Sequence, residues 1–594
     1  MAITDLAKYV LEHASRTNNL KLLLAFSAFF LYKYRSHAVG TRRRADLKTP
    51  KGAIPFLGHL SVMASIPGTK LYDFYEKNYN ELGPVWSISL PFFRMIQGDS
   101  PELVEHVLKN NFWAYEKGPV VRDLFGDLFG KGIFTADGSD WKWQRKMASH
   151  IFNVRAFREY TNDIFVAEGQ KMLAYLGKAA DEGTPIDFHA LMLHFTLDSF
   201  GAVSFGESFG CMDDIESEVD FAVAFDDLAA ITFDRLMDPA WKIRERFTSV
   251  GKKVTDDRNL VRDHAFRIIE KRRADGYHKS KKDLLQLFME AKDDEGKPLP
   301  DEYLVDIILT FTIAGRDTTA QALSWMFYLI NRDGTDKEIM KTLIQEVDDV
   351  LEGKLPTYES HKQQKYADAC LGLDFLPFTA FILFLYANSA QFSFFVFSAL
   401  PPIALRIFPV VPRNLKLCVQ DDILPDGTKI YAGECFSWSS YVMGRSEAIW
   451  GPDAREYKPS RWLQGQKFSQ GKFNSFNAGP RVCLGMNFAI LEALTVIGMI
   501  LQKFELTLVD SGKLPPHGVS ITMPMMEGLP MKVTRPASTK SKKESTAVPK
   551  SPQKDSVSAS GLVVDVVAVD EFAEDCVRRA SAPVSSSCVC FGEE

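Results

Sequence analysis

The chain has 594 residues, of which 25% are charged and 46% are apolar, and its formal net charge is −6. This composition is ordinary for a globular protein. No basic field dominates the charge, which argues against nucleic acid as a partner. The eight cysteines form no CxxC pair, so neither a zinc site nor a disulfide framework is indicated, and reduced thiols are expected. The chain also lacks a phosphate-binding Gly-rich loop, a GxSxG elbow and an HExxH motif.

Residues 1–48 predict a membrane anchor with a basic flank. The run "LKLLLAFSAFFLY", Leu20–Tyr32, is apolar apart from Lys21, and the uncharged residues before it lengthen it. A membrane-spanning helix needs about 20 such residues. Seven basic residues follow between Lys33 and Lys51, a pattern typical of the cytoplasmic side. A cleaved signal peptide is the alternative, and it fits less well because the apolar run starts late.

The next segment, residues 49–64, predicts a stiff hinge. Its sequence "TPKGAIPFLGHL" contains Pro50, Gly52 and Pro55, which interrupt regular structure. At the other end of the chain, residues 537–594 include "STKSKKESTAVPKSPQKDSVSAS". Such a composition cannot bury enough apolar surface to fold, so a disordered tail is predicted.

Residues 65–536 predict one catalytic domain that is mainly α with small β-sheets. Apolar residues recur every three to four positions through most of it, as in "SDWKWQRKMASHIF". A long helix is expected from about Asp301 to Asn331. In "LKLCVQDDILPDGTKIYAG" the Pro-Asp-Gly sequence predicts a β-hairpin.

The stretch "FNAGPRVCLGMNFAILEA" presents one cysteine, Cys483, between a Gly-Pro loop and the start of a helix. Backbone N–H groups at a helix N-terminus stabilise negative charge and favour a thiolate. A thiolate can serve as an axial ligand of haem iron. Gly485 follows two residues later, where a bulky side chain would crowd a flat ligand. For an isolated cysteine, a buried structural role would be the simpler interpretation.

The whole string, however, resembles the haem-binding signature of the cytochrome P-450 monooxygenases. Phe476, Gly479, Arg481, Cys483 and Gly485 all stand at the spacing of that family. The resemblance implies a cytochrome P-450 fold that binds haem b through a Cys483 thiolate. It also implies that Phe476 packs near the sulfur and that Arg481 pairs with a haem propionate.

Other landmarks of this family follow in order along residues 50–535. In "DWKWQRKM", Trp141 and Arg145 are four residues apart and share one helix face, where both can donate to a propionate. Arg413, in "FPVVPRNLK", resembles a further propionate partner of the family. Arg461, in "EYKPSRWL", resembles the family's structural arginine in the meander.

"AGRDTT" lies within the long helix and resembles the family's oxygen-binding motif. Glycine inside a helix costs about 1 kcal/mol, so Gly315 needs a reason, and we expect that it lets a planar ligand approach. By resemblance, Thr318 hydrogen-bonds dioxygen and Asp317 relays protons. A plain core helix is the alternative.

The chain departs from the family at its Glu-x-x-Arg helix. Arg406 is present, but Ile403 stands where the family has a glutamate that pairs with Arg406 and with Arg461. The start of this helix, "KYADACL", ends at Leu371. Residues 372–403 separate the two parts and include an uncharged, Phe-rich run.

This insertion has three candidate origins: a second membrane segment, a natural helical hairpin and a translated intron. A membrane segment would pull a core helix into the bilayer, and a hairpin should be polar on its outer face. The run is rich in Phe, Leu and Ser, whose codons are largely pyrimidine-rich, and introns carry a pyrimidine tract. We therefore interpret residues 372–403 as an anomalous insertion from a translated intron, and expect Arg406 and Arg461 to lack their carboxylate.

Together these features predict a membrane-anchored haem-thiolate monooxygenase of the endoplasmic reticulum, with its catalytic domain in the cytosol. It would use dioxygen, a lipophilic substrate and electrons from a separate NADPH-cytochrome P-450 reductase. Strings such as "HFTLDSFGAVSFG" resemble the branches that hydroxylate fatty acids and alkanes at the terminal carbon. Three alternatives remain open: another lipophilic substrate such as a sterol or xenobiotic, a haem-thiolate isomerase or dehydratase, and an inactive membrane protein.

Overall fold

The computed structural model describes residues 27–30, 32–34, 37–150, 152, 161–238, 240–275, 283–293, 296–371, 404–463, 468–518 and 520–536. Most of the predicted anchor, the insertion 372–403 and the predicted tail 537–594 lie outside these residues. In the parts that are described, no helix has the length and apolar character needed to cross a membrane.

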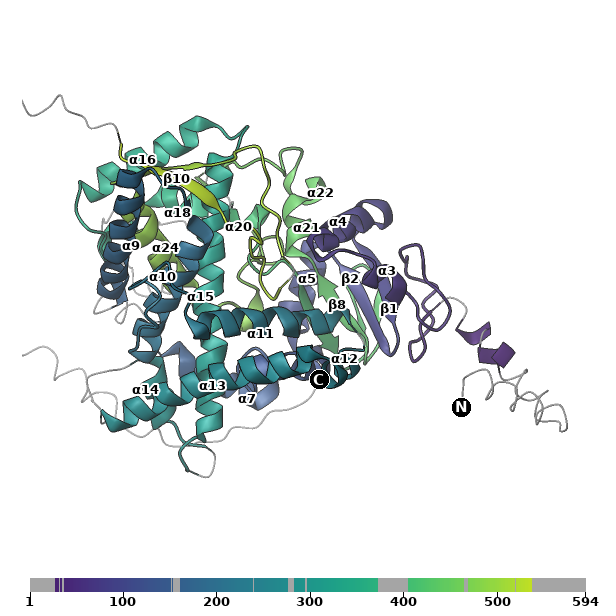
Figure 1. Ribbon diagram of the computed structural model, residues 1–594. Coiled ribbons are helices and arrows are strands. Elements are labelled where there is room, and N and C mark those ends of the chain that lie inside the picture. The colour runs from purple at the N-terminus through teal and green to yellow at the C-terminus, as the bar shows by residue number, and fades with distance from the viewer. Residues whose placement is uncertain are drawn as a thin grey trace, which may run out of the picture. The chain divides into compact units, whose positions relative to one another are not determined.

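Helix α15, Asp301–Asn331, runs through the middle of the helical part of the molecule (Figure 1). Its bounds confirm the predicted long helix. It starts after Pro300 with acidic residues in its first turn, which the positive end of the helix dipole favours. Helices α10, α13 and α24 pack against it. The other helices of seven or more residues are α4 (Leu71–Leu82), α6 (Gly118–Phe129), α7 (Gly138–Ser149), α9 (Asn162–Glu182), α10 (Phe188–Phe205), α11 (Asp220–Met237), α12 (Trp241–Phe247), α13 (Ser249–Ala274), α14 (Leu284–Glu290), α16 (Lys337–Leu351), α18 (Lys365–Leu371) and α24 (Met486–Leu501).

Short helical turns connect these elements. The α-helical ones are α3 (Leu60–Ala64), α5 (Pro101–Glu105), α17 (Tyr358–His361), α20 (Ala404–Ile407), α21 (Ser440–Arg445), α22 (Glu447–Trp450) and α23 (Ser460–Leu463). The 3-10 turns are η1 (Gly68–Lys70), η3 (Phe112–Ala114) and η5 (Gly479–Arg481), and η2 (His106–Asn110) is a π-helical turn.

The strands form small sheets, as predicted. The largest has the order β1-β2-β8-β5-β3, in which only β2 and β8 pair in parallel. It lies beside α3 and α4, to the right of the helices in Figure 1. A second sheet has the order β4-β10-β9, and β6 pairs with β7. The strands are β1 (Val85–Leu90), β2 (Phe93–Gly98), β3 (Tyr115–Glu116), β4 (Ile186–Asp187), β5 (Asn414–Cys418), β6 (Asp422–Ile423), β7 (Lys429–Ile430), β8 (Cys435–Trp438), β9 (Glu505–Leu508) and β10 (Pro530–Thr534).

The hairpin predicted from Pro-Asp-Gly is the β6–β7 pair. Its turn closes with the Leu424 N–H group donating to the Thr428 carbonyl at 2.8 Å, and Gly427 adopts a φ of 86°. Glycine accepts this left-handed conformation without a steric penalty.

Residues of the segment predicted as a hinge form backbone hydrogen bonds with β1. The Ser87 N–H group donates to the Lys48 carbonyl at 2.9 Å, and the His59 N–H group donates to the Ser89 carbonyl at 2.8 Å. A Cβ atom at Gly58 would lie 2.2 Å from that same Ser89 oxygen. Residues 49–64 therefore lie against β1, and their last five residues form α3.

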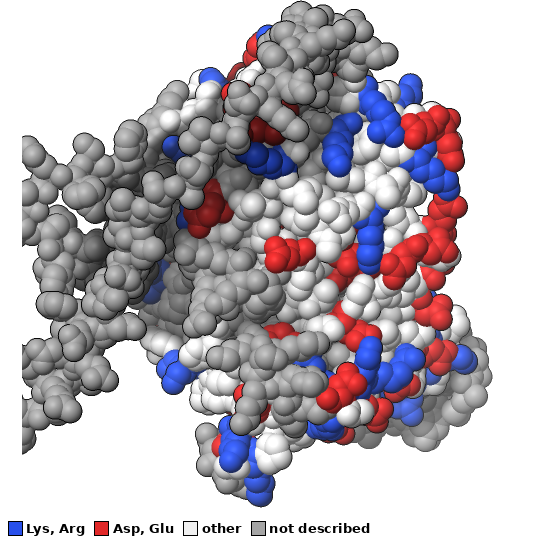
Figure 2. Space-filling view, turned by 90° about the vertical axis from the view of Figure 1, so that its left-hand side faces the viewer, with Lys and Arg blue, Asp and Glu red and all other residues white. Residues whose placement is uncertain are grey.

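The apolar core is built around α15. Its C-terminal half packs in a cluster with α16, α24 and β10, and its N-terminal half packs in a second cluster with α10, α11 and α13. A third cluster lies between the largest sheet and α5. On the face shown in Figure 2, basic and acidic side chains are interspersed around an uncharged area.

Candidate functional site

The cysteine loop is shaped by local backbone constraints. Asn477 and Gly479 have φ values of 64° and 60°, and the Cys483 N–H group donates to the Phe476 carbonyl at 2.9 Å. A Cβ atom at Gly479 would lie 2.1 Å from the Leu108 carbonyl oxygen, so only glycine fits there. The loop therefore turns back on itself and presents Cys483 just before α24 begins.

The Cys483 side chain is exposed, although many protein atoms surround it and raise the pKa of its thiol through burial. The backbone of Gly485 and the positive charge of Arg145 act in the opposite direction and favour the thiolate. A Cβ atom at Gly485 would meet only the Phe152 ring, at 3.8 Å. Protein packing therefore does not require glycine here, whereas a flat group lying against the loop would.

Basic side chains gather beside this loop. The Arg481 guanidinium lies 4.5 Å from the centroid of the Trp141 ring on α7, and that of Arg145 lies 6.0 Å from the same ring. Arg481 also donates to Asp137 at 2.8 Å. The structure thus brings Trp141, Arg145 and Arg481 together near Cys483.

Arg413, predicted as a propionate partner, contacts a different set of residues in this structure. This residue lies just before β5, with its guanidinium 3.6 Å from the centroid of the Tyr75 ring and its Nη2 donating to Ser437 Oγ at 3.0 Å. It does not join the basic cluster. Lys416, three residues further along, does so instead, because side chains alternate between the two faces of a strand.

Lys416 is the site residue that the sequence reasoning missed. Its side chain is 2% exposed, and its Nζ atom has no hydrogen-bond partner among the described residues. Burial lowers its pKa well below the usual value, and the nearby positive charges of Arg481 and Lys117 lower it further. A lysine inside a predicted strand was the available signal, since buried charges are normally paired.

The cluster has more cations than anions. Burial and Arg481 lower the pKa of Lys117 to about 8. The carboxylate of Asp137 accepts from Arg481 and from the backbone N–H groups of Lys117 and Gly118. An unpaired buried lysine beside the Arg481 guanidinium and Lys117 suits an added ligand with carboxylates, so these residues could hold the propionates of a haem.

On α15, two residues face an accessible space. In the stretch Leu304–Ile330, Ala314 and Thr318 are the residues that are not buried. The Thr318 hydroxyl donates to the Ala314 carbonyl at 2.8 Å, so this face carries a hydroxyl bonded back into its own helix. The expectation for Gly315 was wrong: a Cβ atom there would lie 1.9 Å from the Phe200 ring of α10, so glycine permits close helix packing.

Asp317 is buried beside this face. Its carboxylate lies 3.4 Å from Arg316 and accepts a weak bond of 3.5 Å from Thr522. Burial raises its pKa to about 6, and Arg316 opposes this increase. An acid with a pKa in this range can both release and accept a proton near neutral pH.

The predicted structural network is present only in part. Arg461 pairs with Asp453, so the expectation that Arg461 lacks a carboxylate was wrong. Arg406, on α20, is 1% exposed and donates to the carbonyls of Gly444, Ala454 and Glu456. Among the residues that the structure describes, no carboxylate pairs with Arg406.

Comparisons with known proteins agree with this site. The family model described as Cytochrome P-450 matches residues 48–372 and 404–529 and leaves the segment between them unmatched. Cytochrome P-450 monooxygenase cyp1 of Mycosarcoma maydis is 33% identical over 85% of this chain and 78% of its own length. Cytochrome P-450 86B1 of Arabidopsis thaliana is 31% identical over 86% of this chain and 89% of its own length. Cytochrome P-450 94B1 of the same plant is 32% identical over 74% of this chain and 82% of its own length.

The chain belongs to the cytochrome P-450 family. Members of this family are monooxygenases, a class of oxidoreductase, and carry a haem whose iron is bound by a cysteine thiolate. They generally require dioxygen, a lipophilic substrate and a redox partner.

Proposed function

We propose that this enzyme hydroxylates fatty acids or alkanes at or near the terminal carbon. The observation that carries the proposal is the joint arrangement of a cysteine loop, an unpaired buried Lys416 and an accessible Thr318 face on α15. The choice of substrate class rests on the local resemblance to fatty-acid and alkane hydroxylating branches.

In this proposal the Cys483 thiolate would hold the haem iron, and Trp141, Arg145, Arg481 and Lys416 would bind the propionates. Phe476 packs beside the sulfur, as its carbonyl bond to the Cys483 N–H group suggests. The haem supplies the activation of dioxygen when it is bound. The protein residues orient the substrate and exclude water.

Thr318 and Asp317 would deliver protons. The Thr318 hydroxyl is on the accessible face of α15, and Asp317 behind it has a pKa of about 6. We expect the hydroxyl to hydrogen-bond dioxygen and the carboxyl to exchange protons with it. Efficient proton transfer needs a donor whose pKa lies near the working pH.

An apolar chain should bind with its tail toward Thr318. A carboxylate at its other end should remain near the channel mouth, because burying an ion is costly. Spectral titration with fatty acids, alkanes and sterols tests the substrate class, and product analysis tests the position. Products oxidised mainly beside the carboxylate would contradict this orientation.

The enzyme is further proposed to be anchored by residues 1–48 in the membrane of the endoplasmic reticulum, facing the cytosol and a NADPH-cytochrome P-450 reductase. The apolar run and its basic flank support this topology. Membrane fractionation of the full chain and of a variant lacking residues 1–48 tests it. Equal membrane association of both would remove the anchor from the proposal.

We also propose that residues 372–403 derive from a translated intron and that residues 537–594 are a disordered tail. The interruption of the family match over residues 373–403 supports the first idea. Sequencing the transcript tests it: a dominant message that retains these codons would exclude it. A carbon-monoxide difference spectrum of the reduced protein separates a haem enzyme from an inactive membrane protein.

A further inference from the structure

Arg316 links α15 to α11. Its side chain is 2% exposed, and its Nη1 and Nη2 atoms both donate to the carboxylate of Asp226, the second at 2.8 Å. The same Nη1 lies 3.4 Å from the carboxylate of its neighbour Asp317. Arg316 is therefore shared between two carboxylates, and the Asp226 contact is the closer one.

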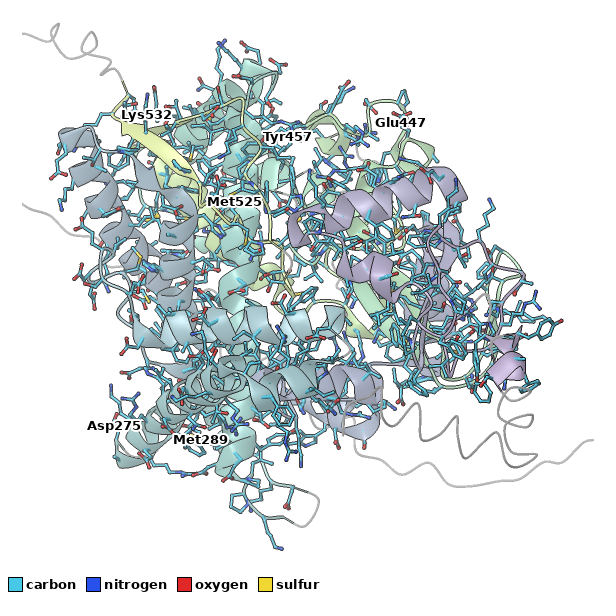
Figure 3. The ribbon with its side chains drawn as sticks, turned by 45° about the vertical axis from the view of Figure 1, so that its right-hand side comes forward. Asp275, Met289, Glu447, Tyr457, Met525 and Lys532 are labelled. Carbon is cyan, nitrogen blue, oxygen red and sulfur yellow. The ribbon has the colours of Figure 1, made fainter. Side chains whose placement is uncertain are left out.

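The histidines and the cysteine around Asp317 and Arg316 contribute little charge. Burial lowers the pKa of His189 to about 4, lowers that of His194 and raises that of Cys211 to about 12, so all three are uncharged near neutral pH. Asp198 accepts the Met212 N–H group at 2.7 Å. The Thr522 hydroxyl approaches Asp317 from the segment that precedes β10. This segment lies beside α15, and its residue Met525 is labelled in Figure 3.

The sharing of Arg316 has a consequence for Asp317. An arginine that paired with Asp317 alone would lower its pKa by about 1–3 units, and the carboxyl would stay ionised. Asp226 instead accepts from both Nη1 and Nη2 of Arg316, and only Nη1 also reaches Asp317, at 3.4 Å. The negative charge of Asp226 itself raises the pKa of Asp317. Burial is the largest cause that raises the pKa of Asp317 to about 6, Arg316 opposes it, and Asp226 adds to it.

We propose that Asp226 is a positioning residue that competes with Asp317 for Arg316, weakens the pair between Arg316 and Asp317, and thereby lets Asp317 carry a proton. Asp226 lies on a different helix, 90 positions before Arg316, and its side chain is 50% exposed. The protonation of Asp317 would therefore depend on a residue of α11 as well as on its own helix, α15. This inference rests on the proposed role of Asp317 in proton delivery.

Infrared titration of the full chain tests the inference without catalysis. The carboxylic acid band of Asp317 is identified as the one that Asp317→Asn removes. In Asp226→Asn we expect its midpoint to fall by about one pH unit or more, because Arg316 then pairs with Asp317. Asp226→Ser provides a second neutral variant in case asparagine disturbs α11, and Asp226→Glu should retain the original midpoint.

Asp227→Asn is the matched control. This neighbour removes the same charge from the same helix but pairs with Lys253 at 2.6 Å, so it should leave the Asp317 band unchanged. The amount of product formed per NADPH depends on pH, and this pH profile should shift together with the Asp317 band in Asp226→Asn. It should stay unchanged in Asp227→Asn. An unshifted Asp317 band in both neutral variants overturns the inference. Unchanged coupling in Asp317→Asn would instead reject the proposed relay, which is a separate failure.

Discussion

The buried Arg406 makes it possible to measure how much the insertion 372–403 lowers the free energy of unfolding. It is buried on α20 and donates to backbone carbonyls, and no described carboxylate pairs with it. The perturbation removes residues 372–402 and changes Ile403→Glu, which places a carboxylate three residues, about one helical turn, before Arg406. The matched control carries the same deletion with Ile403→Gln, which has the same shape without the charge.

The magnitude follows from the burial of Arg406. Burial lowers its pKa from 12.5 to about 9. At about 1.4 kcal/mol per pKa unit, the charged form is disfavoured by about 5 kcal/mol. Leaving one partner of a buried ion pair uncompensated typically costs about 3–5 kcal/mol. The margin of a whole domain is only about 5–15 kcal/mol, so this one residue is significant for folding.

Denaturant titration and haem content per chain are the assays. We expect the glutamate variant to exceed the glutamine variant by about 3–5 kcal/mol in its free energy of unfolding. It should also bind a full complement of haem, whereas the full chain with residues 372–403 should bind little. Equal stability of the glutamate and glutamine variants would refute the electrostatic reasoning. Equal haem content with and without the insertion would show that the insertion is tolerated.

Three further predictions concern the haem site. Cys483→Ala should abolish the long-wavelength carbon-monoxide band while Cys435→Ala keeps it; a band that survives in Cys483→Ala contradicts the ligand assignment. Thr318→Ala should retain haem but form less product per NADPH, because the hydroxyl steers protons, and unchanged coupling would exclude this role. Lys416→Met should weaken haem retention about tenfold or more, measured by transfer to apomyoglobin, since it loses a charged hydrogen bond. Arg413→Met is its control, and equal losses in both variants would count against the assignment of Lys416.

The sequence alone determined the features that depend on neighbouring residues. The cysteine loop could be located because Gly479 and Gly485 stand at fixed spacing around Cys483, and their backbone requirements are local. The long helix could be bounded because its helical pattern starts after Pro300. The β6–β7 hairpin could be placed because Pro-Asp-Gly encodes its own turn.

Only the tertiary structure decided which distant residues meet. It brought Lys416 into the basic cluster and turned Arg413 toward Tyr75. It also gave Gly315 a packing partner in Phe200, and Arg461 an acidic partner.

The ion pair between Asp226 and Arg316 is the clearest example of a contact that the sequence could not predict. Neither residue carries a local signal for the other, because their contact exists only where α11 crosses α15. Spacing along the chain reports the conformation of a few residues at a time. The direction and the protonation of a buried charge depend on whichever groups the folded chain places around it.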